Sequence, residues 1–208
     1  MNALVTFKEV GAIRKGHFVL KSGRHSDCYV NKDMIFLHPD IVSMFCASMA
    51  NSFKDDAIDV VIGPVIGGVI LSHLTAFHLS EMTGREVLSA FAEKDGDGFI
   101  IKRGYPEFIS GKRVLVVEDV LTTGGSVKKV AEEIRKIGGI VAGVAALCDR
   151  GAVSYNDVGN PEKFICLFNY PVIDWDEESC PLCMKGTPIN TDVGKGKEYL
   201  EKKGETAS

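Results

Sequence analysis

The chain has 208 residues, 45% of them hydrophobic and 25% charged, which is the composition of a globular protein with a good-sized core. Its formal net charge of −4 gives no general electrostatic attraction to nucleic acid or to anionic membranes, so neither is expected as a partner. The longest apolar stretch, residues 60–71, contains Pro64 and three glycines and is too short to span a bilayer.

The first 38 residues predict one short helix followed by two strands. Four apolar residues recur there at roughly helical spacing: Leu4, Phe7, Val10 and Ile13. They predict a helix over residues 2–15 that ends at Gly16. Charged residues interrupt the same run, so it lacks the core of a signal peptide, and a cytoplasmic protein is expected. Residues 18–20 and 28–30 are typical of short strands on either side of a Lys-Ser-Gly-Arg turn.

Strand and helix patterns alternate from residue 39 onwards. Asp40 is expected to cap a helix whose buried residues are Ile41, Met44, Phe45, Met49 and Phe53. Further helices are predicted over 67–82 and 125–137, each ending before a glycine. The predicted strands cover residues 60–62, 87–92, 113–117, 140–148 and 163–168. This alternation predicts an α/β fold with a parallel sheet flanked by helices, in which ligands bind at the carboxyl ends of the strands.

A glycine-rich loop lies between the strand at 60–62 and the helix at 67–82. Its sequence, Ile-Gly-Pro-Val-Ile-Gly-Gly-Val, can expose consecutive backbone N–H groups at the start of that helix. Such groups attract anions, so we interpret residues 64–68 as an anion-binding loop. The alternative is a glycine-rich turn that only allows close packing.

Residues 93–111 lie between two strands and are rich in glycine and charge. An Asp-Gly-Asp-Gly turn at 95–98 is followed at once by apolar residues. This pattern predicts a projecting, mobile hairpin.

Residues 114–126, Val-Leu-Val-Val-Glu-Asp-Val-Leu-Thr-Thr-Gly-Gly-Ser, carry the most specific pattern in the chain. A buried strand leads into Glu118 and Asp119, and a turn rich in glycine and hydroxyl groups then precedes a helix. The glycines let the backbone wrap closely around an anion, and the N–H groups of the helix start favour negative charge there. The carboxylates suit ribose hydroxyls or the surroundings of Mg2+. The pattern therefore implies one loop that binds a sugar by its hydroxyls and its 5′-phosphate; an ordinary strand–turn–helix is the alternative.

Five of the six cysteines divide into core thiols and one close pair, and Cys28 lies apart from both in a loop of interest. Cys46, Cys148 and Cys166 lie in apolar runs and are interpreted as reduced core thiols. Cys180 and Cys183 form the one Cys-x-x-Cys, but no histidine lies downstream and the five histidines are scattered, so a zinc site within one chain is not expected. We interpret the pair as structural thiols; a four-cysteine site across a dimer and a redox pair are the alternatives.

The pattern at 114–126 resembles the signature of the type I phosphoribosyltransferases for 5-phospho-α-D-ribosyl 1-diphosphate (PRPP). The resemblance implies that Glu118 and Asp119 bind the ribose hydroxyls and orient Mg2+ indirectly, with no direct protein ligand to the metal. It makes the rest of the loop substrate-binding, its last five residues holding the 5′-phosphate: Val120, Leu121, Thr122, Thr123, Gly124, Gly125 and Ser126. It assigns pyrophosphate to the glycine-rich loop, namely Pro64, Val65, Ile66, Gly67 and Gly68.

The segment from Phe18 to Asn31 resembles more narrowly the N-terminal hood of the orotate phosphoribosyltransferases. The shared pattern is Phe-x-Leu-x-Ser-Gly followed by a serine and an aromatic residue. The resemblance implies that Lys21 reaches PRPP or orotate, and that Ser22, Gly23 and Tyr29 line the base pocket. The alternative is a solvated lysine in a surface turn.

Two further regions match that family in position. The hairpin at 93–111 corresponds to a lid that closes over the site, often that of a neighbouring subunit, which implies a homodimer. The usual basic cluster is altered here, so we take Lys94, Lys102 and Arg103 as the cations above pyrophosphate, with solvated hairpin charges as the alternative. Arg150, after Asp149 at a strand end, corresponds to the arginine that binds the orotate carboxylate; a strand-end salt bridge is the alternative.

The sequence thus predicts a type I phosphoribosyltransferase fold with one domain over residues 1–190. Within it the hood covers 1–38 and the lid 93–111, and a polar tail over 191–208 is expected to fray. The implied function is Mg2+-dependent phosphoribosyl transfer from PRPP to orotate, giving orotidine 5′-monophosphate and pyrophosphate in pyrimidine synthesis. The alternatives are a phosphoribosyltransferase for a purine or another base, and a non-catalytic PRPP-sensing regulator.

Overall fold

The computed structural model describes residues 2–204 and divides the chain into two compact units. A central unit comprises residues 38–170, and a terminal unit combines residues 2–37 with 171–204. Each unit has its own sheet. Among the described residues, no helix combines the length and the apolar character needed to cross a bilayer.

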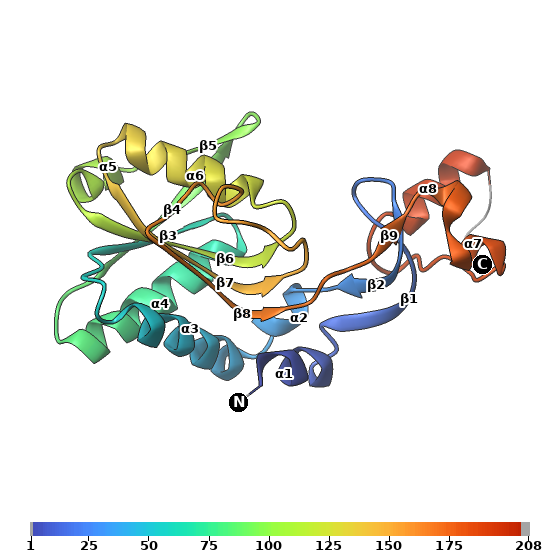
Figure 1. The fold of residues 1–208 in the computed structure, drawn as a ribbon, viewed down its shortest axis with the longest axis horizontal. Coiled ribbons are helices and arrows are strands. Elements are labelled where there is room, and N and C mark those ends of the chain that lie inside the picture. Colours follow the sequence, from blue (N-terminus) through green and yellow to red (C-terminus); the bar gives the residue numbers. More distant parts are fainter. Residues whose placement is uncertain (1, 205–208) are drawn as a thin grey trace. The chain divides into compact units, whose positions relative to one another are not determined.

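The central unit is built on a six-stranded sheet in the order β5-β4-β3-β6-β7-β8 (Figure 1). Its strands are β3 (Val60–Pro64), β4 (Leu88–Asp95), β5 (Gly98–Ile100), β6 (Arg113–Leu121), β7 (Ile140–Asp149) and β8 (Lys163–Asn169). All neighbours pair in parallel except β4 and β5, which form an antiparallel hairpin at one edge. The predicted α/β fold with a mainly parallel sheet is confirmed.

Helices cover both faces of this sheet. On one face lie α3 (Pro39–Phe53) and α4 (Gly67–Thr83), and on the other lie α5 (Tyr105–Ile109) and α6 (Gly125–Lys136) (Figure 1). Since both faces are covered, the inner strands are apolar without alternation, and every residue of β3 is buried. The strands therefore give a rigid base for the loops at their carboxyl ends.

Helix α3 differs from its prediction in two details. It begins at Pro39 behind the N-cap residue His38, so Asp40 lies in the first turn and does not cap the helix. Its buried face contains Val42 and Cys46, whereas Ile41 and Met44 are only partly buried. Apolar residues occupy most positions from 41 to 46, so periodicity alone did not determine which face turns inward.

The terminal unit begins with α1 (Ala3–Glu9), β1 (Ile13–Val19), β2 (His25–Val30) and α2 (Asp33–Phe36). Its C-terminal part adds β9 (Asp174–Trp175), the 3-10 helix η1 (Glu177–Ser179), α7 (Pro181–Met184) and α8 (Gly196–Lys203). Its sheet has the order β1-β2-β9. The helix predicted over 2–15 is wrong beyond Glu9: Gly11 turns the chain with a φ of 71°, and residues from Ile13 are extended because they pair with β2.

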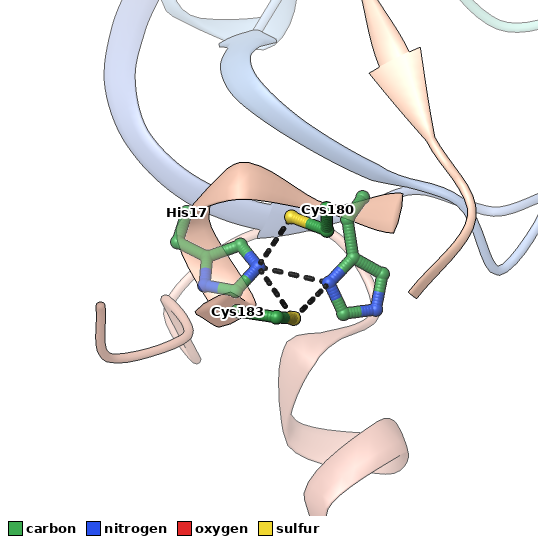
Figure 2. Close-up of side chains that lie close together, drawn as sticks. His17, Cys180 and Cys183 are labelled. Atoms are coloured by element: carbon green, nitrogen blue, oxygen red, sulfur yellow. Dashed lines mark hydrogen bonds between the residues drawn. The ribbon is translucent and has the colours of Figure 1, made fainter. Parts of the chain in front are cut away.

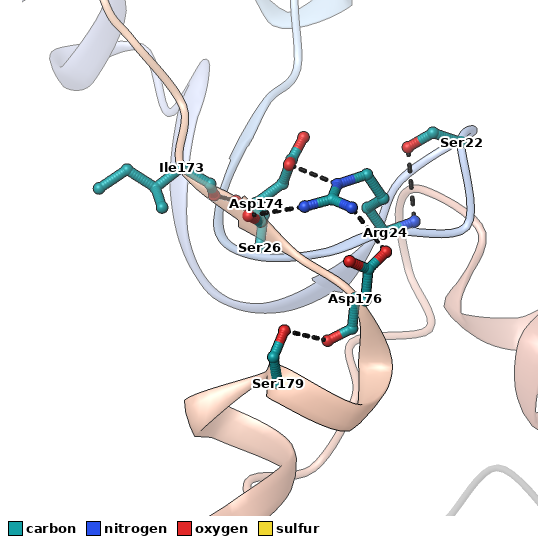
Figure 3. Close-up of polar contacts among 7 residues, drawn as sticks. All are labelled: Ser22, Arg24, Ser26, Ile173, Asp174, Asp176 and Ser179. Atoms are coloured by element: carbon teal, nitrogen blue, oxygen red, sulfur yellow. Dashed lines mark hydrogen bonds and ion pairs between the residues drawn. The ribbon is translucent and has the colours of Figure 1, made fainter.

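Arg24 ties the β1–β2 hairpin to β9 (Figure 3). Its Nε lies 2.6 Å from Asp174 Oδ1, and its Nη1 lies 2.6 Å from Asp176 Oδ1. Hydrogen bonds to Asp174 and then to Asp176 raise the pKa of Arg24 above its ordinary value. The Ser26 hydroxyl adds a hydrogen bond of 2.7 Å to the carbonyl oxygen of Ile173. Residues far apart in the sequence are thus joined by directional bonds.

The segment predicted to fray contains α8. The Lys195 N–H donates to the Val19 carbonyl oxygen at 2.8 Å, and Asn190 N–H donates to the His17 carbonyl oxygen at 2.7 Å. Lys203 pairs with Glu177 of η1. These contacts hold the segment to β1 and η1, which the polar composition of the tail did not reveal. The predicted tail residues 205–208 lie outside the described residues.

Candidate active site

The loops predicted to bind substrate meet where the strand order of the central sheet reverses. From β3 the chain moves to β4 on one side, and it returns to β6 on the other side of β3. Because β3 and β6 are parallel neighbours, the loops that follow them emerge at the same edge of the sheet. A reversal of this kind is where open α/β sheets bind ligands, outside the carboxyl ends of the strands.

Glu118 and Asp119 stand near the carboxyl end of β6, and they are 9% and 3% exposed. Glu118 Oε1 accepts the Asp119 N–H at 3.0 Å, and Asp119 Oδ1 accepts the Val120 N–H at 2.7 Å. These bonds fix each carboxylate against the backbone of the strand end. The pair therefore presents pre-positioned anionic acceptors, which suit the hydroxyl groups of a sugar.

The turn after β6 depends on Gly124. This residue has a left-handed φ of 74°, and a β-carbon there would lie 2.4 Å from the carbonyl oxygen of Asp157. Asp157 is itself fixed, because the hydroxyl and N–H of Ser154 donate to its carboxylate at 2.6 and 2.8 Å and lower its pKa. Glycine is required at 124 both by the backbone conformation and by the space.

A pocket of about 100 Å³ opens at this turn. It is lined by Glu118, Val120, Leu121, Thr122, Thr123, Gly124, Gly125, Ser126 and Val127. The side chains of Thr122, Thr123 and Ser126 are exposed, and α6 begins here without a side-chain cap. An uncapped helix start among hydroxyl groups offers several donors to an anion, so the structure brings together the loop residues that the sequence singled out.

The loop after β7 lies against the same turn. The Arg150 N–H donates to the Leu121 carbonyl oxygen at 3.0 Å, and a β-carbon on Gly151 would lie only 1.6 Å from the Thr122 carbonyl oxygen. The carboxylate of Asp149 accepts the N–H groups of Gly151 at 2.9 Å and Val153 at 3.1 Å, and it does not pair with Arg150. The alternative interpretation of Arg150, a strand-end salt bridge, is therefore wrong. Within residues 2–204 the Arg150 guanidinium forms no ion pair.

The glycine-rich loop after β3 is closely packed. A β-carbon on Gly63 would lie 2.3 Å from the Gly68 carbonyl oxygen, so these two glycines allow the strand end and the helix start to touch. The Val65 N–H donates to the Ala92 carbonyl oxygen at 3.0 Å, so this one N–H group of the loop is already paired with the neighbouring strand. Pro64, Gly67 and Gly68 are buried, whereas Ile66 is 81% exposed. What remains for an anion is the start of α4, which has no side-chain cap.

The predicted hairpin is present as β4 and β5, and it projects from the sheet edge (Figure 1). It is shorter than the predicted segment, because Ile101 and Ile109 are buried in the core. Lys94 and Lys102 are exposed. Arg103 is already engaged: its Nε lies 2.6 Å from Glu93 Oε1, and its guanidinium stacks 5.7 Å from the centre of the Phe91 ring.

The terminal unit carries the residues predicted to cover the base. Lys21, Ser22 and Gly23 form an exposed turn between β1 and β2, with a φ of 84° at Gly23. Tyr29 lies in β2, where its ring centre is 5.6 Å from that of Phe18. The two strands predicted around the Lys-Ser-Gly-Arg turn are confirmed, and the roles of these side chains toward a base stay predictions.

Sequence reasoning missed one cluster in the terminal unit. The ligand atoms of His17, His25, Cys180 and Cys183 all lie within 4.8 Å of one another. The prediction that the cysteine pair has no histidine partners is therefore wrong. The two kinds of residue stand at opposite ends of the chain, so no local spacing signals their meeting. Burial, and then the neighbouring His17, lower the pKa of His25, whereas burial raises the pKa of Cys183 to about 11.

Comparison with known proteins gives consistent relatives. A family model described as a phosphoribosyl transferase domain matches residues 40–178. An orotate phosphoribosyltransferase of Caldanaerobacter subterraneus subsp. tengcongensis is 42% identical over 186 residues, which are 89% of this chain and 93% of the relative. A second, from Pelotomaculum thermopropionicum, is 42% identical over 184 residues, covering 88% and 90% of the two chains.

Solved structures show the same fold at lower identity. The crystal structure of orotate phosphoribosyltransferase from Aeropyrum pernix aligns with a TM-score of 0.64 and 24% identity, covering 81% of this chain and 93% of that one. The Mycobacterium tuberculosis orotate phosphoribosyltransferase in complex with PRPP aligns with a TM-score of 0.60 and 22% identity, covering 80% and 93%. The predicted type I phosphoribosyltransferase fold is confirmed.

Proposed function

The chain belongs to the phosphoribosyltransferase family, among the orotate phosphoribosyltransferases, and from that premise we propose how its residues carry out the reaction. The enzyme transfers the phosphoribosyl group of PRPP to orotate, which yields orotidine 5′-monophosphate and pyrophosphate in pyrimidine biosynthesis. The observation that supports our assignment of the site is the course of β6, which delivers two buried carboxylates and then the Gly124 turn to the uncapped start of α6.

The sugar and its phosphate occupy this strand end in our proposal. Glu118 and Asp119 accept hydrogen bonds from the ribose hydroxyls, while residues 122–126 donate to the 5′-phosphate from backbone N–H groups and hydroxyls. Both carboxylates are fixed by backbone N–H groups, so they meet the sugar without reorganisation. The start of α4 after Ile66 is the second donor site, for the pyrophosphate end of PRPP.

The residues at this edge also fit Mg2+ bound together with PRPP. Carboxylate oxygens are the hard ligands that Mg2+ prefers, and Glu118 and Asp119 place two such groups next to the phosphate turn. When bound, Mg2+ offsets the negative charge that develops on the leaving pyrophosphate. We propose that the two acids orient it through the ribose hydroxyls and are not its direct ligands.

No protein nucleophile is needed, because the base nitrogen of orotate displaces pyrophosphate at C1′ of the ribose. The protein aligns the two substrates, excludes water and places fixed charges around them. We assign base alignment to Arg150 and the hood residues Lys21, Ser22, Gly23 and Tyr29. We assign stabilisation of the departing pyrophosphate to Lys94, Lys102 and Arg103 of the hairpin.

Replacing Arg150 with alanine should raise the KM for orotate by roughly 10- to 100-fold, the effect of losing one charge-assisted bidentate pair. The KM for PRPP should change little, because the backbone N–H of residue 150, which bonds to Leu121, remains. Steady-state kinetics with each substrate varied in turn measure both constants. Arg150→Lys keeps the charge but loses the planar fork of the guanidinium. Its KM for orotate should therefore lie between those of the parent chain and of Arg150→Ala. Equal rises in the KM for orotate and the KM for PRPP would contradict a specific role of Arg150 in orotate binding.

Replacing Arg103 with alanine should lower kcat by roughly tenfold while PRPP affinity changes less, if this cation acts on charge that develops in the transition state. Its ion pair with Glu93 must open for this role, so Glu93→Gln should leave kcat unchanged or raise it. The measurement is kcat together with the equilibrium binding of PRPP. Equal losses in both quantities would count against the transition-state role.

We also propose that the enzyme works as a homodimer in which the hairpin of one subunit closes the site of its partner. Mixing Arg103→Ala with a variant that is inactive at Asp119 checks this, because mixed dimers would contain one site with neither change. If the mixture is more active than the sum of the two variants measured separately, the result supports a hairpin that closes the partner's site. Activity equal to that sum, under conditions where subunits exchange, contradicts it.

The direct test of the reaction is the Mg2+- and PRPP-dependent loss of orotate, followed by its ultraviolet absorbance. Adenine, hypoxanthine and uracil serve as alternative acceptors under the same conditions. We expect turnover of orotate alone. Turnover of another base would retain the PRPP loops and overturn the assignment of Arg150. PRPP binding without any turnover would indicate a sensor.

A further inference from the structure

The terminal unit contains a cluster of four side chains that the phosphoribosyl transfer does not use. His17 comes from β1 and His25 from β2, Cys180 is the N-cap residue of the short helix α7, and Cys183 lies within that helix. His17, His25 and Cys180 are buried, with exposures of 2%, 0% and 0%. Cys183 is partly buried, and both sulfurs are free thiols. Figure 2 shows the His17 ring pointing between the sulfurs of Cys180 and Cys183.

Three nitrogen–sulfur distances in this cluster are close to the edges of a tetrahedron around a metal ion, and all ligand atoms lie within 4.8 Å of one another. Zinc bonds of about 2.0–2.1 Å to nitrogen and about 2.3 Å to sulfur give tetrahedral N···S edges of about 3.6 Å. His17 Nε2 lies 3.6 Å from Cys180 Sγ and 3.7 Å from Cys183 Sγ, and His25 Nδ1 lies 3.3 Å from Cys183 Sγ. The two ring nitrogens, 2.8 Å apart, need to separate by about half an ångström to reach the tetrahedral N···N edge.

The surroundings of His17 orient it as a ligand. Its Nδ1 lies 2.8 Å from the carbonyl oxygen of Thr187, so Nδ1 carries the proton and the lone pair of Nε2 faces the cluster. A metal-bound histidine usually donates its second N–H to an acceptor of this kind. The His25 ring packs nearly perpendicular to the ring of Tyr199 from α8, with ring centres 5.1 Å apart and an angle of 81° between the ring planes. A pocket that reaches His17 and Cys183 gives an ion a path to the cluster.

We propose that His17, His25, Cys180 and Cys183 bind one Zn2+ ion. Two nitrogens and two sulfurs in tetrahedral positions are the ligands typical of zinc among common biological metals. Four protein ligands leave no open coordination position, so the ion is structural and takes no part in the transfer.

The ion would join two parts of the chain that are distant in sequence. Cys183 and His17 are separated by 166 positions, and the ion links the β1–β2 hairpin to the segment that carries α7. The same hairpin bears the turn with Lys21. The proposed zinc site therefore fixes the base of the hood hairpin, whatever the acceptor base of the enzyme is.

The first test measures the zinc content of the full-length chain. The protein is purified without chelators and analysed by inductively coupled plasma mass spectrometry. We expect about one zinc ion per chain, and less than about a tenth of that in Cys183→Ser. Two control variants should keep the ion: Cys166→Ser, at a thiol of β8, and His73→Ala, at an exposed histidine of α4. Equal zinc loss in the controls would show adventitious binding and overturn the proposal.

A second measurement uses the unaltered chain and does not depend on how the variants fold. Replacing zinc with Co2+ in the reduced protein should give the visible absorption of a tetrahedral ion, with thiolate charge-transfer bands, at about one ion per chain. Absence of zinc together with failure to take up Co2+ would overturn the site. So would a Cys180–Cys183 disulfide in the protein as purified, because oxidised sulfurs cannot serve as thiolate ligands.

Discussion

The variant Gly124→Ala should lose at least about 100-fold in kcat/KM for PRPP, because the turn that wraps the 5′-phosphate cannot keep its shape. An alanine at a φ of 74° is strained by roughly 1–2 kcal/mol. Its β-carbon would also lie 2.4 Å from the Asp157 carbonyl oxygen, so either the turn or the loop at Asp157 must move. Equilibrium binding of PRPP and steady-state kinetics report the loss.

Gly84→Ala is the matched control for this change. Gly84 ends α4 with a similar φ of 66°, but a β-carbon there would meet nothing within 4 Å. It should therefore cost only about 1–2 kcal/mol of stability, with kcat/KM unchanged. If both variants bind PRPP as the parent chain does, the turn at 122–126 does not hold the phosphate.

The variant Asp119→Asn should lower kcat/KM for PRPP by roughly 10²- to 10³-fold. The amide has nearly the same shape, so the backbone contact at Val120 can be retained while the charge is lost. Loss of a charged acceptor for the ribose hydroxyls in a buried site corresponds to about 3–4 kcal/mol. Since Asp119 is only 3% exposed, water cannot replace its carboxylate easily.

Asp59→Asn provides the comparison on the same sheet. Asp59 precedes β3 at the opposite edge, where its carboxylate accepts the Arg113 N–H at 3.0 Å and lies 3.8 Å from the Arg85 guanidinium. This variant should lower stability by about 1 kcal/mol and change kcat/KM less than about twofold. A parental kcat/KM for Asp119→Asn would exclude the acid pair from the proposed site.

The local pattern at 114–126 predicted its own structure well. The strand, the acid pair, the turn and the helix follow one another within 24 residues, from Arg113 at the start of β6 to Lys136 at the end of α6. Each step is decided by neighbouring residues: an apolar run for a buried strand, glycine for a left-handed turn, and an amphipathic pattern for α6. Relatives at 42% identity support the same family that this pattern indicated.

The glycine-rich loop shows where such reasoning stops. Its sequence correctly placed a turn between β3 and α4, but Val65 N–H bonds to Ala92 of the neighbouring strand and Gly63 packs on Gly68. Whether the Val65 N–H faces a ligand or the neighbouring strand depends on Ala92, which lies 27 positions further along the chain. The engagement of Arg103 by Glu93 and Phe91 is a similar case.

The sequence by itself determined the alternating α/β order, the loop of Glu118, Asp119 and Gly124, and the family, because short-range patterns specify strands, turns and helix starts. Only the tertiary structure decided that the loop after β7 lies against that turn, and that His17 and His25 meet Cys180 and Cys183. Such contacts join segments up to 166 positions apart, and they follow from strand pairing and packing of whole elements. No local spacing records them, since residues that meet only in the folded chain leave no periodic signal in the sequence.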